Sequence, residues 1–172
     1  EVVLARPFCN LVRFCRVSPI AAARNDPKVL IVAPMSGHFA TLLTGTGKTL
    51  LADHDVYVTD WRNARDVGVE HGPFGLDELV DHVVEFVQVL GPRSHVIAVC
   101  QPCVPVLAAV AVLAEDRNLA QPSSMTLVAG PVDVDVSPTS VNALARSAPP
   151  GWFRDTVVTP VPPPHRGAGR GV

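Results

Sequence analysis

Residues 95–103, with the sequence HVIAVCQPC, pass from a short apolar run directly into a turn that holds two cysteines and a proline. A brief, nearly continuous apolar run that ends at a turn is typical of a buried strand in a parallel sheet. Residues 104–115, which follow, are rich in alanine, valine and leucine and predict a helix. This stretch therefore predicts a strand, a tight turn and a helix in immediate succession.

The same alternation of strands and helices extends in both directions from this stretch. Residues 76–90 carry apolar side chains at three- and four-residue spacing, and Gly91-Pro92 is a typical helix end. Short apolar or β-branched runs between the helices predict further strands. The expected strands are Lys28–Met35, Asp55–Asp60, His95–Val99 and Ser124–Ala129, and the expected helices are Phe39–Leu51, Leu76–Leu90 and Val104–Glu115. This repetition indicates an α/β fold, a parallel sheet with helices on both faces.

Composition excludes several classes of protein. The 172 residues carry a formal net charge of −2, so there is no cationic excess for binding nucleic acid. No apolar run reaches the ~20 residues of a transmembrane helix, and the start of the chain lacks a signal-peptide pattern. Four cysteines do not make the disulfide framework of a small secreted domain. We therefore predict a cytoplasmic protein with reduced thiols, with neither a metal nor a cofactor.

The candidate chemistry lies at the carboxyl end of the strand 95–99. Ligands of open parallel sheets bind at this edge, and Cys100 occupies the strand-to-helix turn where α/β-hydrolases carry their nucleophile. Ala98 and Pro102 stand at the flanking positions, which usually hold glycine, and both residue types are tolerated there. Backbone N–H groups at a helix start favour the thiolate, and the N–H of Gln101 points where an oxyanion would form.

Three other interpretations of the cysteines remain open at this point. Cys100 and Cys103 could both be small buried hydrophobic residues, as free cysteines often are. The spacing Cys-Gln-Pro-Cys at a helix start also matches the redox motif of thioredoxin-like proteins. A zinc site would need Cys9 and Cys15 to approach the same turn.

Residues 45–49, GTGKT, resemble the end of a phosphate-binding P-loop. The motif requires a glycine where this chain has Leu42. The segment is therefore predicted to be a surface turn with a solvated Lys48, not a nucleotide site.

Five segments together resemble the intracellular polyhydroxyalkanoate (polyhydroxybutyrate) depolymerases. They are KVLIVAPMSGHFATLL (28–43), DHDVYVTDWRNARD (53–66), VCQPCVP (99–105), AGPVD (129–133) and PTSVN (138–142). The resemblance implies an α/β-hydrolase that cleaves ester bonds of the polymer or its oligomers, at the storage-granule surface, through a cysteine nucleophile. Carried over by position, Cys100 is that nucleophile, and Ser36, Gly37 and the Gln101 N–H form the oxyanion hole. Polyhydroxyalkanoate synthase, a related acyltransferase, is the nearest alternative, but it typically keeps glycines beside its cysteine.

The catalytic acid and base are less clear from the sequence. In this fold class they follow the nucleophile in the order acid, then histidine, and His165 is the one histidine after Cys100. A local triad of Cys100, Asp133 and His165 can therefore be written, but no strand can be identified after Ala129 to carry its last two members. The alternative is a truncated fragment whose acid and base lie beyond residue 172, and which is inactive or severely impaired alone.

The sequence is accordingly divided into two parts. Residues 1–148 are predicted to form a partial α/β-hydrolase core, with the nucleophile elbow at 98–102. Residues 149–172, rich in proline and glycine, are predicted to be an extended tail that begins the missing C-terminal part.

Overall fold

A six-stranded sheet forms the centre of the protein in the computed structural model, which describes residues 1–35, 43–160 and 170–171. The strands lie in the order β1-β2-β4-β3-β5-β6. β3 (Lys28–Val32), β4 (Asp55–Trp61), β5 (His95–Val99) and β6 (Ser124–Val128) are parallel to one another. The prediction of an α/β fold is confirmed, with the strands shorter or longer than expected by a few residues at their ends.

Two N-terminal strands, which the sequence analysis missed, extend this sheet. β1 (Val2–Ala5) and β2 (Cys9–Arg13) form an antiparallel hairpin, and β2 pairs antiparallel with β4. The sheet is therefore mixed and not purely parallel. Cys9 and Leu11 of β2 are fully buried, while Asn10 between them is not, which is the alternation of a half-buried strand.

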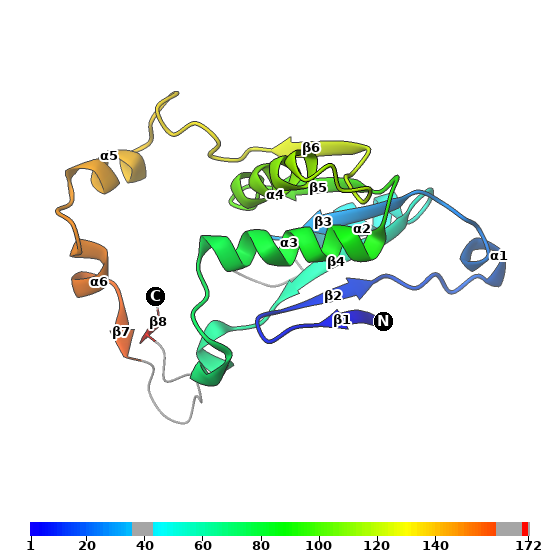
Figure 1. Ribbon diagram of the computed structural model, residues 1–172, viewed down its shortest axis with the longest axis horizontal. Coiled ribbons are helices and arrows are strands. Elements are labelled where there is room, and N and C mark those ends of the chain that lie inside the picture. The colour runs from blue at the N-terminus through cyan, green and yellow to red at the C-terminus, as the bar shows by residue number, and fades with distance from the viewer. Residues whose placement is uncertain (36–42, 161–169, 172) are drawn as a thin grey trace.

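Two long helices cover one face of the sheet. α3 (Leu76–Leu90) and α4 (Cys103–Glu115) lie side by side in front of the strands in Figure 1. α3 has the predicted bounds. Its start is fixed by Glu78, whose carboxylate accepts a hydrogen bond from the Gly75 N–H (2.6 Å), and its end by Gly91 at φ 79°. Leu76, the first residue of the apolar series in this helix, is 56% exposed, whereas Phe86 is fully buried with Val83 and Val87.

A third helix, α2 (Thr44–Leu50), packs on the opposite face. Side chains alternate across a strand, so Val56 and Trp61 of β4 point to opposite faces. Trp61 meets the ring of His82 on α3 at 6.1 Å between centroids. Phe14 lies opposite Val56, to whose carbonyl oxygen its N–H donates, so its side chain is on the same face of the sheet as that of Val56. On that face the Phe14 ring lies against Gly47 of α2. The core thus has helices on both faces of the sheet.

The GTGKT segment is not the surface turn that the sequence predicted. Residues 45–48 lie inside α2, although Lys48 is exposed as expected. Packing of Gly47 against Phe14 outweighs the low helix propensity of the two glycines. The part of the predicted helix before residue 43 lies outside the described residues. Shorter elements are α1 (Pro19–Ala22) and 3-10 helices at Ala64–Asp66 and Val69–His71.

The C-terminal part lies apart from the sheet. α5 (Ser140–Ser147) and α6 (Trp152–Thr156) bury no residue, and Figure 1 shows both beside the main body. α6 is a correction, because residues from 149 onward were predicted to be extended. Gly151 at φ 84° begins this short helix. β7 (Thr159–Pro160) and β8 (Arg170–Gly171) pair antiparallel in a second, two-stranded sheet.

The helices of the described segments are short relative to a bilayer. α3 has 15 residues and α4 has 13, whereas a span needs about 20. Within those segments, no helix is both long and apolar enough to cross a membrane.

The buried face of α3 makes a direct prediction for stability. Phe86 is fully buried between α3 and the sheet, so Phe86→Ala should lower the free energy of unfolding by about 3–5 kcal/mol. Val89→Ala, on the same helix at a position 44% exposed, should change it by less than about 0.5 kcal/mol. Urea denaturation of both variants measures the difference, and similar losses in the two would contradict this packing.

Candidate active site

The turn at Cys100 joins β5 to α4 and has an unusual backbone. Cys100 is exposed and has φ 67°, in the left-handed region that residues other than glycine rarely adopt. Its N–H donates to Val128 O at 2.8 Å, and the Cys103 N–H donates to Cys100 O at 3.1 Å. These two bonds hold the turn between the sheet and the helix. Such a backbone costs about 1–3 kcal/mol and is enriched at functional sites, although Arg93, Arg117, Ala129 and Ser137 of this chain also have positive φ.

Small residues around the turn let the strand, the helix and the next loop approach closely. Ala98 is fully buried in β5, and Pro102 precedes the first residue of α4. A side chain on Gly130, just after β6, would overlap the Cβ and Sγ of Cys103. The sequence showed Gly130 as part of a motif but did not show this contact, because it depends on how β6 lies beside β5.

The structure separates the four cysteines by exposure. Cys100 and Cys15 are exposed, whereas Cys9 and Cys103 are buried. Burial raises the pKa of the Cys9 thiol far above its ordinary value. Cys103 Sγ lies 3.5 Å from Ala98 O and 3.6 Å from Val128 O. The interpretation as a buried hydrophobic residue is thus correct for Cys103 and wrong for Cys100.

A second rigid feature lies where β3 leaves the sheet. The Ala33 N–H donates to Thr59 Oγ1 at 2.9 Å, and the Trp61 indole N–H donates to Ala33 O at 2.8 Å. All three residues are buried. Two side chains of β4 therefore fix both backbone groups of Ala33 beyond the end of the β3–β4 ladder. The sequence did not show that Trp61 would hold this strand exit, because the contact joins residues 28 positions apart in the chain.

The oxyanion-hole prediction is covered only in part by the described residues. Gln101 follows Cys100 directly and is exposed, in the turn before α4. Ser36 and Gly37 lie outside the described residues, three and four positions after Ala33. Their role stays a prediction.

The local triad also stays a prediction. Asp133 is exposed, and its Oδ1 accepts a hydrogen bond from the Asp135 N–H at 2.9 Å. His165 lies outside the described residues. Among the residues that are described, none forms a hydrogen bond with the exposed Cys100 thiol.

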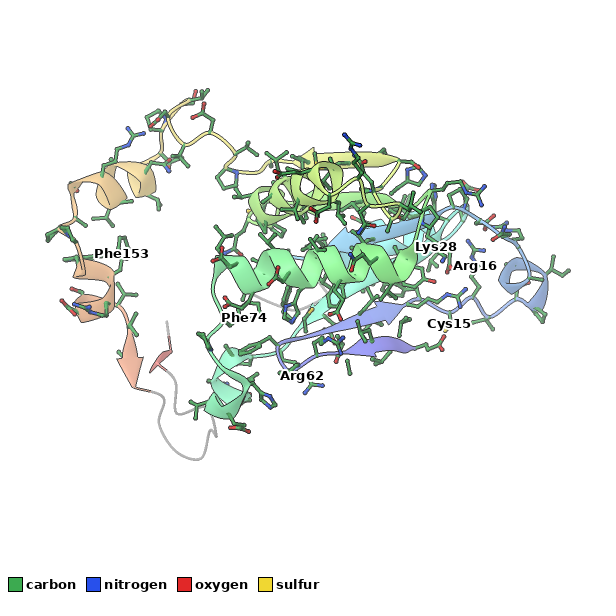
Figure 2. All side chains as sticks on the ribbon, viewed as in Figure 1. Cys15, Arg16, Lys28, Arg62, Phe74 and Phe153 are labelled. Carbon is green, nitrogen blue, oxygen red and sulfur yellow. The ribbon has the colours of Figure 1, made fainter. Side chains whose placement is uncertain are left out.

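A metal site built from the four cysteines does not form. Cys9 is on β2, which β4 and β3 separate from β5, a distance of about 14 Å at the usual strand spacing. Figure 2 shows Cys15 at the other end of the sheet, where β2 ends. Across the described segments, no group of three or more His, Cys, Asp and Glu side chains could hold a metal ion.

Comparison with known proteins gives two findings. Residues 129–172 match the family model described as the PHB de-polymerase C-terminus, which confirms the resemblance for this segment. A solved structure of an N-formylmaleamic acid deformylase from Pseudomonas putida S16 is similar to this chain at a TM-score of 0.56 and 18% identity. The match covers 86% of this chain and 50% of that one, so the chain spans half of the known structure, and this likeness concerns the fold alone. No curated protein matches the chain.

Exposure and position predict which thiol reacts first. Iodoacetamide at neutral pH should modify Cys100 fastest, because its thiol is exposed on the turn, whereas the thiol of Cys15, which is also exposed, donates to Glu1 Oε2 at 3.8 Å. Cys15 should react more slowly, and buried Cys9 and Cys103 should be protected in the native state. Peptide mass mapping with fragmentation gives the rate at each cysteine. Equal rates at all four would rule out the elbow assignment.

The surroundings of Gly130 and Gly45 predict that replacing each by alanine changes the free energy of unfolding in opposite directions. Gly130→Ala should lower the free energy of unfolding by about 1–3 kcal/mol, because the new methyl group overlaps Cys103. Gly45→Ala, in α2 with open space around the new Cβ, should raise it by about 0.5–1 kcal/mol. Thermal unfolding followed by circular dichroism tests both. A Gly130→Ala variant as stable as the unmodified chain would show that β6 and α4 are not so closely packed.

Proposed function

We propose that this chain is the nucleophile-bearing part of a polyhydroxybutyrate depolymerase, a carboxylic ester hydrolase with an α/β-hydrolase core. The observation that carries the proposal is Cys100, exposed at φ 67° on the turn between a parallel strand and a helix. A strained strand-to-helix turn that exposes the nucleophile is the characteristic feature of that fold. The family match at residues 129–172 supports the substrate, a storage polyester inside the cell.

In the proposed reaction the Cys100 thiolate attacks an ester carbonyl of the polymer. The carbonyl oxygen becomes an oxyanion, which the Gln101 N–H stabilises together with a donor from the loop that holds Ser36 and Gly37. The C–O bond then breaks, and the alcohol end of the departing chain takes up a proton. Water hydrolyses the resulting thioester and regenerates the thiol.

Rigid elements support this assignment of roles. Cys100 and Gln101 are held between β5 and α4 by the bonds to Val128 and Cys103. Thr59 and Trp61 of β4 fix Ala33, which follows β3, the strand beside β5, and from which the proposed oxyanion loop departs. Both parts of the oxyanion hole would therefore start from fixed backbone, which is what stabilisation of a developing charge requires.

The exposed C-terminal part fits a water-insoluble substrate. Val132, Val134 and Val136 precede α5 and are all exposed, as are Leu144 on α5 and Phe153 on α6. Figure 2 shows Phe153 on α6, away from the sheet. These residues belong to the segment that matches the depolymerase family, and their apolar side chains would lie against the polyester at the granule surface.

An activated ester tests the nucleophile. With a p-nitrophenyl ester, the chain should release one equivalent of p-nitrophenol and gain one acyl group on Cys100, seen by intact-protein mass. Cys100→Ala should abolish both, and Cys15→Ser, which alters an exposed cysteine at the other end of the sheet, should leave both unchanged. Acylation that persists in Cys100→Ala would overturn the proposal.

Turnover tests the acid and the base. Without an acid and a histidine positioned at Cys100, hydrolysis should be slower by several orders of magnitude than with a complete triad. We therefore expect no sustained release of 3-hydroxybutyrate from amorphous granules. Sustained release that His165→Ala or Asp133→Ala eliminates would instead establish the local triad.

A further inference from the structure

We propose that Cys100 and Cys103 form a reversible oxidation site, at which a hydroperoxide converts the two thiols into a disulfide. The proposal rests on the pairing of one exposed and one fully buried thiol within a single turn. The sheet is not that of a thioredoxin, so the Cys-Gln-Pro-Cys spacing does not indicate a general oxidoreductase. It does place a second sulfur directly beside the proposed nucleophile.

The backbone brings the two cysteines within disulfide range. Residues 100–103 form a turn closed by the Cys103 N–H to Cys100 O bond at 3.1 Å. Turns of this kind hold their first and fourth Cα atoms within about 7 Å, and disulfides join Cα atoms about 4.4–6.8 Å apart. Cys100 N and Cys103 Sγ also share one acceptor, Val128 O, at 2.8 and 3.6 Å.

The hydrogen bonds of the Cys103 sulfur are weak. Its two oxygen neighbours, Ala98 O and Val128 O, are 3.5 and 3.6 Å away, and a thiol is a weak donor. Rotation of Sγ about the Cα–Cβ bond toward Cys100 therefore loses little hydrogen bonding, although it has to take place in a packed environment beside Gly130. Neither of the other cysteines can take this part, because Cys9 is three strands away and Cys15 lies at the opposite end of the sheet.

The chemistry proceeds in two balanced steps. The Cys100 thiolate attacks one oxygen of hydrogen peroxide, the O–O bond breaks, and the departing hydroxide takes up a proton, leaving Cys100 as a sulfenic acid. Cys103 then loses its proton, its sulfur attacks Cys100 Sγ, and the S–O bond breaks to release hydroxide, which leaves as water with that proton. The two thiols supply the two electrons that reduce one peroxide to two waters.

Disulfide formation at this site would protect Cys100 from irreversible oxidation and would at the same time prevent it from attacking an ester. The disulfide ties Cys100 Sγ into an S–S bond, so no thiolate is left to attack an ester, and a dithiol reductant restores the thiol. A buried partner in the same turn also stops oxidation before the irreversible sulfinic stage. The loss of acylation rests on the proposed function, but formation of the disulfide does not.

Mass spectrometry of the full 172-residue chain tests the proposal. After peroxide treatment and alkylation of free thiols, the tryptic peptide 94–117 should be lighter by two hydrogens and unalkylated at both cysteines. This peptide contains Cys100 and Cys103 and neither Cys9 nor Cys15. Dithiothreitol should restore the original mass. The readout does not depend on esterase activity, so a chain that forms the disulfide but never acylates would contradict the proposed function alone.

Matched variants identify the resolving thiol. Cys103→Ala should stop at the sulfenic acid, trapped on Cys100 by dimedone, and should pass to the sulfinic acid with longer exposure. Cys15→Ser should behave as the unmodified chain. If the unmodified chain itself accumulates the dimedone adduct, with no peptide 94–117 lighter by two hydrogens, the proposal is wrong. That result is read on the unmodified chain, so a folding defect in Cys103→Ala cannot obscure it.

Discussion

The close approach of Gly130 to Cys103 is the constraint on which the arrangement of the site depends. Because residue 130 has no side chain, the loop after β6 lies directly against the first turn of α4. Val128, two residues earlier, can then accept the N–H of Cys100. This bond stabilises a left-handed backbone that an isolated cysteine would rarely adopt. The exposure of Cys100 is thus a consequence of packing two strands and one helix at a single point.

Elements with strong local signals could be predicted from the sequence, and elements that depend on distant partners could not. α3 was predicted to the residue because its apolar spacing, its first-turn acids and Gly91 all agree. The hairpin of β1 and β2 was missed because its strands are short and β2 finds its partner, β4, some fifty residues later. At α2 the helix predicted for Phe39–Leu51 is confirmed over Thr44–Leu50, and the surface turn predicted for residues 45–49 is wrong, because contact of Gly47 with Phe14 outweighs the low helix propensity of the glycines.

The same division holds for the site. The position of Cys100 between a strand and a helix follows from an apolar run, a proline and a second apolar run in sequence, so this turn could be predicted before the fold was seen. The parts played by Gly130, Thr59 and Trp61 could not, because each acts across the sheet on a residue far away in the chain. A glycine directly after the next parallel strand is the one local signal that could have indicated such a contact.

The two proposed reactions at this turn have one physical origin. Both start from the exposed Cys100 sulfur, and a thiolate attacks an ester carbonyl and a peroxide oxygen alike. Which of the two reactions takes place therefore depends on the other groups around Cys100, and the two reactions require different groups. The proposed ester cleavage would need donors and a base from other elements as well as Cys100. The proposed disulfide would need only Cys103, which the turn itself supplies. Disulfide formation therefore does not depend on the acid and base of ester cleavage, and the two reactions can be measured separately.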